Sequence, residues 1–173
     1  CDHPIESCIV LSPVETDFAG SPTIRGITRE ECLQILRDAA ESGLVHSTGN
    51  YRDGAHYICN CCSCCCGVLR GVAEFHTPAA IAASRFRAVI DEELCMRCGT
   101  CEDRCPVGAV SIGDDAARVS ASHCIGCGLC VATCPTNALQ LARRPQSEAP
   151  PPPANRLEWM QEKAAQRGLP PVL

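Results

Sequence analysis

The chain has 173 residues, the size of one or two small domains, and only 3% of them are aromatic. So few aromatic side chains leave little material for a conventional hydrophobic core. The formal net charge of −5 excludes the basic footprint of a nucleic-acid-binding protein, and no run of 18 apolar residues predicts a membrane span. The 17 cysteines predict instead that bound metal clusters take the place of that core.

Residues 1–27 are predicted to form a loop, because proline and glycine residues occur throughout this segment. Thr28 followed by Glu31 forms a capping box, and the spacing of the apolar residues after it predicts a helix over 29–42. Gly43 is the expected C-terminal end of this helix.

A cysteine-dense segment with the sequence CNCCSCCC follows the first helix. Adjacent cysteines cannot generally all point at one metal centre, so the number of ligands stays open at this stage. A [4Fe-4S] cluster is our favoured interpretation, with a structural zinc or a redox dithiol as the alternatives. His46 is expected to pack or cap rather than bind metal. The predicted ligands are drawn from the six cysteines of this segment and two upstream: Cys1, Cys8, Cys59, Cys61, Cys62, Cys64, Cys65 and Cys66.

Four short elements are predicted around the cysteines of the C-terminal half. A helix is expected from Thr77 to about Ser84, and the β-branched alternation of residues 86–90 predicts a strand. Residues 110–112 and 118–120 predict a hairpin. A closing strand over 139–142 is expected to pair with the strand that precedes Cys95.

Two copies of one cysteine phrase dominate this half, CMRCGTCEDRCP at 95–106 and CIGCGLCVATCP at 124–135. Three cysteines at intervals of three residues, then a fourth followed by proline, are the bacterial spacing for [4Fe-4S] clusters. Zinc sites usually combine two C-x-x-C units into one tetrahedral set, and disulfides between residues three apart are geometrically awkward. We therefore predict two [4Fe-4S] clusters.

In proteins with two such clusters, the fourth cysteine of each run binds the other cluster. This rule assigns the ligands of the first cluster as Cys95, Cys98, Cys101 and Cys134. It assigns the ligands of the second cluster as Cys124, Cys127, Cys130 and Cys105.

After residue 144 the chain becomes proline-rich, which predicts an extended, semi-rigid spacer. Asn155 and Glu158 form a second capping box, and a helix is expected from Arg156 to about Arg167. A helix on a proline tether is a candidate docking arm for a partner. It is equally compatible with folding back onto its own domain.

Residues 95–143 closely resemble the bacterial two-cluster ferredoxin domain, because all eight ligand positions and both Cys-Pro pairs are present. The elements CDHPIESC, AESGLVHSTGN and ICNCCSCCCGVLRG are similar to those of ferredoxin-like proteins that carry a cysteine-rich region before the dicluster domain. Such relatives have a further C-x-C-R element upstream, and the resemblance implies that its cysteines join Cys1 and Cys8 in a cluster. Because this chain opens at Cys1 without that element, we expect it to be part of a longer polypeptide.

The expected fold class is α+β, with a small ferredoxin-like dicluster domain preceded by a mostly helical or irregular cysteine-rich region. We divide the chain into the cysteine-rich region, the ferredoxin domain, the proline-rich linker and the docking helix, at 1–84, 85–144, 145–154 and 155–173.

The expected function is electron transfer through two [4Fe-4S] clusters and a third in the cysteine-dense segment, as a carrier or as part of a larger oxidoreductase. The sequence has no nucleotide-binding or nucleophile motif, so no catalytic residue is predicted. The alternative is a reductase with an open iron–sulfur or dithiol centre at 59–66, and a zinc-stabilised interaction module is a third possibility. We expect a cytoplasmic, anaerobic setting and a redox partner protein.

Overall fold

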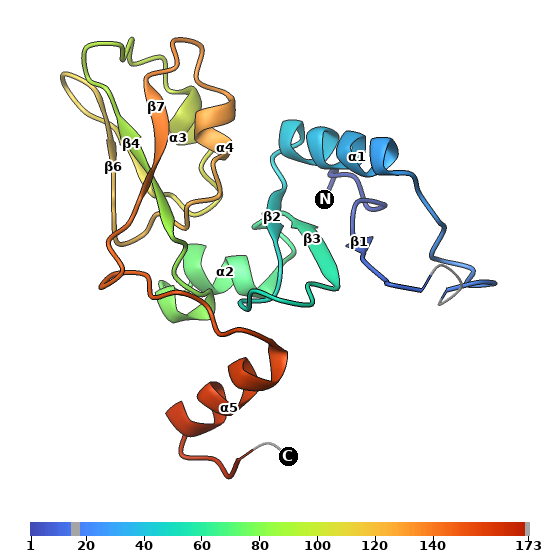
Figure 1. Cartoon of the computed structure of the whole chain (residues 1–173). Helices are drawn as coiled ribbons and strands as arrows, with labels where there is room; N and C mark the ends of the chain where they lie inside the picture. The colour runs from blue at the N-terminus through green and yellow to red at the C-terminus, as the bar shows by residue number, and fades with distance from the viewer. Residues whose placement is uncertain (15–17, 172–173) are drawn as a thin grey trace.

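The computed structural model describes residues 1–14 and 18–171, which form a cysteine-rich N-terminal half and an α+β C-terminal half (Figure 1). The elements of the N-terminal half are β1 (Ile9–Val10), α1 (Arg29–Glu41), β2 (Val45–Ser47), β3 (Tyr57–Cys61), α2 (Gly67–Ala73) and the 3₁₀ helix η1 (Pro78–Ala80). Those of the C-terminal half are β4 (Phe86–Ile90), α3 (Thr100–Asp103), β5 (Val110–Ile112), β6 (Ala117–Val119), α4 (Leu129–Ala132), β7 (Leu139–Arg143) and α5 (Arg156–Gln166). The predicted α+β class is confirmed.

The predicted capping box starts α1. The Thr28 hydroxyl accepts a bond from the Glu31 backbone N–H, and the Glu31 carboxylate accepts one from the Thr28 N–H. The N-terminal half also contains an antiparallel sheet in the order β1-β3-β2, and the helix α2, neither of which the sequence predicted. The predicted helix over 77–84 is wrong, because the chain makes only the short η1 and is already extended at Ile81.

The C-terminal half follows its prediction closely. β4 pairs with β7 along its whole length, from Phe86 opposite Arg143 to Ile90 opposite Leu139, and β5 forms a hairpin with β6. The buried side chains between them are alanine, branched aliphatic or sulfur-containing. They are Ala88, Cys101, Val110, Ala117, Cys130 and Leu139. Cys101 and Cys130 are thus part of the core, and further cysteines of the two runs pack against it.

The two halves are joined by the end of α1. The Arg104 guanidinium, which directly precedes Cys105, donates from Nη2 to the carbonyl oxygens of Ala40, at 2.6 Å, and Glu41. These carbonyls belong to the C-terminal turn of α1, where a cation is favourable. Gly43 has a φ of 84°, and a Cβ there would lie 3.3 Å from Arg104 Nη1, so glycine permits the close approach.

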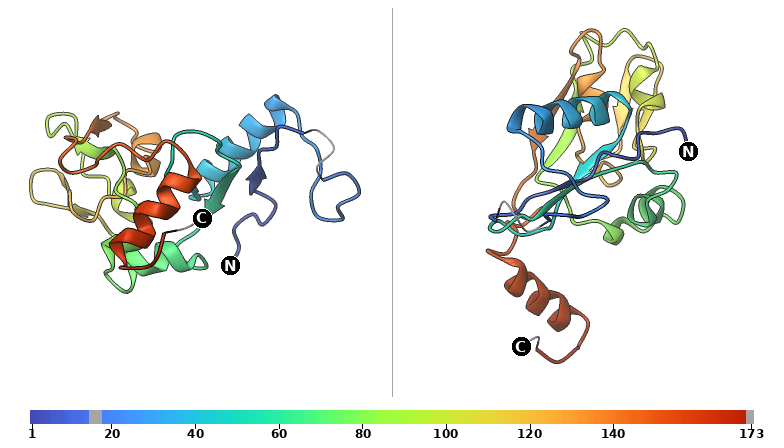
Figure 2. Two further views of the ribbon diagram at one scale, coloured as in Figure 1. Left: turned by 60° about the horizontal axis from the view of Figure 1, so that its bottom comes forward. Right: turned by 90° about the vertical axis from the view of Figure 1, so that its right-hand side faces the viewer.

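The helix α5 projects from the rest of the molecule in Figures 1 and 2. Its tether is held to the N-terminal half where the Arg52 and Asp53 backbone N–H groups donate to the carbonyls of Pro153 and Ala154. The predicted cap is confirmed, since Asn155 accepts a bond from the Glu158 N–H. Its docking role remains a prediction. Among the described residues, no helix is both long and apolar enough to span a membrane.

Candidate metal centres

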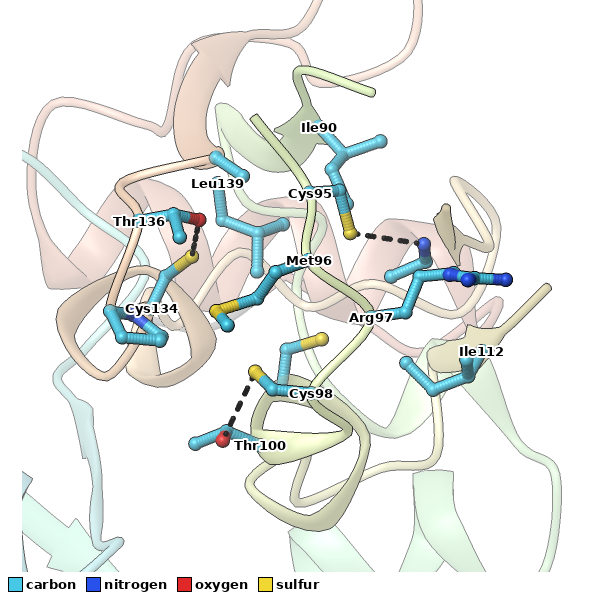
Figure 3. A pocket seen from close by; sticks show the side chains of 14 residues that line it. Ile90, Cys95, Met96, Arg97, Cys98, Thr100, Ile112, Cys134, Thr136 and Leu139 are labelled. Carbon is cyan, nitrogen blue, oxygen red and sulfur yellow. Dashed lines mark hydrogen bonds between the residues drawn. The ribbon is translucent and has the colours of Figure 1, made fainter. Parts of the chain in front are cut away.

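The first site is a cavity in the C-terminal half with about 320 Å³ of empty space, part of which is open to solvent (Figure 3). Three cysteines of the first run and the last cysteine of the second run line it: Cys95, Cys98, Cys101 and Cys134. This grouping is the one that cross-ligation predicts. The two runs reach it because β4 and β7 pair directly and bring their ends together.

Hydrogen-bond donors surround the sulfur atoms of the first site. The Ala117 backbone N–H donates to Cys95 Sγ at 3.4 Å, and the Thr100 hydroxyl lies 3.4 Å from Cys98 Sγ. Hydrogen bonds from the Thr100 side chain and backbone lower the pKa of Cys98. Burial alone would raise the pKa of Cys134, but backbone N–H groups and the Thr136 hydroxyl, 3.7 Å from Sγ, lower it overall. Burial raises the pKa of Cys101, so it is at Cys98 and Cys134 that the hydrogen bonds favour the thiolate, the form that binds metal.

The second site is a cavity of about 310 Å³, so the two cavities are nearly equal in size. It is lined by the complementary set of cysteines: Cys105, Cys124, Cys127 and Cys130. Backbone N–H groups again point at sulfur, from Ala109 to Cys105 Sγ at 3.1 Å and from Ala88 to Cys124 Sγ at 3.5 Å. Burial raises the pKa of Cys127 and also that of Cys130, the latter to about 12.

Both cavities suit an anionic iron–sulfur cluster. Each offers four cysteines around an apolar hollow, together with backbone N–H donors, and hydrogen bonds to sulfur are a standard means by which proteins tune such clusters. The buried core positions are alanine, valine, leucine and cysteine residues, with no aromatic side chain among them.

A third group lies in the N-terminal half. The Sγ atoms of Cys1, Cys62, Cys64 and Cys65 all lie within 4.8 Å of one another, and we call these residues the compact set. Cys64 donates to Cys62 at 2.9 Å, Cys65 donates to Cys1 at 3.5 Å, and Cys1 lies 3.8 Å from Cys62. Hydrogen bonds, first from Cys64 and then from Cys65, lower the pKa of Cys62 to about 7. The compact set can therefore hold a metal ion.

The structure divides the eight cysteines predicted for the N-terminal centre. The compact set takes four of them, and the other four lie outside it: Cys8, Cys59, Cys61 and Cys66. Cys1 and Cys8, which the resemblance joined in one cluster, therefore belong to different groups.

His46 binds another side chain rather than a thiol. Its Nδ1 lies 2.5 Å from Oδ1 of the buried Asn60, whose amide nitrogen donates to the Ser7 carbonyl. Asn60 thus ties the N-terminal segment to β3, although the sequence analysis did not single it out. A polar residue within a strand, with a cysteine on either side, is the signal that marks it.

Residues 88–141 match the family model described as the 4Fe-4S dicluster domain. This part of the chain is accordingly a dicluster iron–sulfur domain, a class whose function is electron transfer, and two [4Fe-4S] clusters are its cofactors. Comparison with curated proteins gave no match for the chain.

Proposed function

We propose that the chain relays single electrons through two [4Fe-4S] clusters, held by the eight cysteines of the first and second sites as assigned from the repeat. The observation that carries the proposal is the cavity pair, each lined by three cysteines of one run and one of the other. When bound, each cluster supplies a one-electron redox couple. Shared ligation by both runs keeps the two centres adjacent and rigid.

The compact set is proposed to bind a single ion, and zinc fits it better than the cubane expected from the sequence. Tetrahedral zinc with Zn–S bonds of about 2.3 Å separates its sulfur atoms by roughly 3.8 Å. Three of the sulfur separations in the compact set are 2.9, 3.5 and 3.8 Å, and all of them are within 4.8 Å, so they span this value. A cubane has four separate iron corners and needs sulfurs spread more widely. Among the described residues, the ferredoxin cysteines form no such tight group.

The number of cysteines in the compact set supports an electron carrier rather than the alternative, a reductase with an open metal centre. Four cysteines complete the coordination of a tetrahedral ion, so a zinc in the compact set has no open position for a substrate. The proposed division of the chain is unchanged, with the electron-transfer unit at 85–144 and a metal-bearing region before it. A redox protein or larger oxidoreductase complex, in a reducing cytoplasm, is the proposed partner.

Anaerobic purification followed by iron, sulfide and zinc analysis tests this function. A dithionite titration followed by EPR should show reversible uptake of one electron per cluster. Cys98→Ala should abolish the signal of the first site, whereas Cys32→Ala in α1, outside every predicted ligand set, is the matched control. A wild-type protein that binds no iron, or an unchanged iron content in Cys98→Ala, would contradict the proposed ligands.

A further inference from the structure

We propose that Cys8, Cys59, Cys61 and Cys66, the strand set, form a further site that binds an iron–sulfur cluster beside the dicluster domain. The inference rests on the proposed electron-transfer function and extends it to a third redox centre. It places that centre away from the compact set, on the opposite face of the N-terminal sheet.

The pairing of β3 brings three of these cysteines together. Cys59 and Cys61 are two residues apart on one strand and share a face, while Asn60 between them is buried on the other. Ile9 pairs with Ile58 in antiparallel register, so Cys8 comes beside Cys59. The bond from Asn60 to the Ser7 carbonyl is consistent with this register and holds the residue before Cys8 in place.

The fourth cysteine comes from the turn after β3. Cys66 is the N-cap of α2, and its backbone N–H donates to the Cys62 carbonyl at 3.1 Å. Cys61 and Cys66 pack against the same apolar cluster of Val45 and Leu69. The neighbouring Cys62 instead packs with Ala39 and Leu44 on the α1 side. Cys61 and Cys62 are adjacent in the dense segment but thus lie on opposite faces of the N-terminal sheet.

The electrostatic interactions of Cys59 and Cys61 are also with other members of the strand set. Burial, and after it the nearby thiolates of Cys66, Cys59 and Cys8, together raise the pKa of Cys61 to about 12. Burial and the thiolate of Cys8 likewise raise the pKa of Cys59. These mutual effects show that the four side chains lie close enough to influence one another, as the strand register also indicates.

The position of the strand set favours a redox centre over a second structural ion. The apolar cluster that contacts Cys61 and Cys66 also contains the buried Leu129, and Cys127 of the second site packs against it. Figure 1 shows β2, β3 and α2 next to the half of the molecule that carries α4. Like the ferredoxin cysteines, and unlike the compact set, these four do not form a tight group for one ion among the described residues.

Metal analysis of the whole chain, purified anaerobically, tests the inference. We expect about 12 irons per chain, four for each of three clusters, and about one zinc. The double variant Cys59→Ala/Cys61→Ala should lose about four irons and one EPR signal while keeping its zinc. The matched variant Cys64→Ala/Cys65→Ala should lose zinc and keep all of its iron.

Two outcomes would overturn the inference without touching the proposed function. One is a wild-type chain with about eight irons and about two zincs, which would make the strand set a zinc site. The other is a Cys59→Ala/Cys61→Ala variant whose iron content and EPR spectrum equal those of the wild type. Persistent signals from the dicluster domain in each variant verify that it has folded. Their absence from the wild type would instead overturn the proposed function.

Discussion

The first and second cluster sites are related by a repeat of 29 residues, from Cys95 to Cys124, yet their surroundings differ. Thr100 and Thr136 lie beside cysteines of the first site. The repeat puts Leu129 and Val107, both buried, at the corresponding places of the second site. One ligand pattern therefore serves a site with two threonine hydroxyls and an exposed cysteine, and a site with buried apolar side chains in place of those threonines.

This difference predicts unequal reduction potentials. Cys98 of the first site is exposed, whereas its counterpart Cys127 is half-buried. Water, hydroxyl donors and the nearby cation of Arg97 all stabilise the extra negative charge of a reduced cluster. The first site should have the higher potential and the second site, next to the N-terminal half, the lower. Electrons that enter near the N-terminal half would then run downhill to the exposed site.

Removing one ligand from each site should give the largest effects and the clearest contrast. Cys127→Ala and Cys98→Ala should each cost about four irons, because each removes one corner ligand. Cys127 also packs against the apolar cluster shared by the two halves, so its variant should have the lower thermal midpoint by circular dichroism. Equal midpoints would mean that the second site does not help to join the halves.

The next largest effect is expected from replacing a glycine that is present in the loop of the second site but not in that of the first. Gly126 has a φ of 69°, and a Cβ there would collide with the Phe86 carbonyl oxygen. Gly126→Ala should destabilise the second site by about 1–3 kcal/mol or more, seen as faster iron loss to a chelator. Arg97, its counterpart in the repeat, has a φ of 55° and an exposed side chain, so Arg97→Gly is the control and should retain iron as the wild type does.

The two threonines should account for part of the potential difference. Replacing Thr100 and Thr136 by valine removes a hydroxyl beside each sulfur and should lower the potential of the first site by roughly 20–60 mV per residue. An EPR-monitored redox titration measures this shift. The potential of the second site is the internal control, and a shift of equal size there would refute the local explanation.

The smallest effect is expected from the exposed charge. Arg97→Gln should lower the potential of the first site by roughly 20 mV in dilute buffer, because it removes one solvated cation from the cavity rim. High salt should abolish the difference, since screening already weakens the interaction in the wild type. A shift that persisted in 1 M salt would point to structural change instead.

Much of the C-terminal half could be read from local sequence. β4, the β5–β6 hairpin and β7 lie at or within one residue of the predicted positions, and the capping boxes predicted both α1 and α5. The exception is the short η1, where a Thr-Pro start was taken for a longer helix. Capping and strand alternation are short-range properties, and they succeed where the chain needs no distant partner.

The sequence by itself indicated which eight cysteines line the two cavities and how they group, because the spacing expected for cluster ligation is visible along the chain. The tertiary structure alone decided how the N-terminal cysteines divide. Cys1 meets Cys62 across 61 residues, and Asn60 reaches back to Ser7 across 53. The face of the sheet on which each cysteine of β3 lies depends on the pairing of β3 with β1 and β2. The sequences of such short strands carry no local signal of which strands will pair, or in which register.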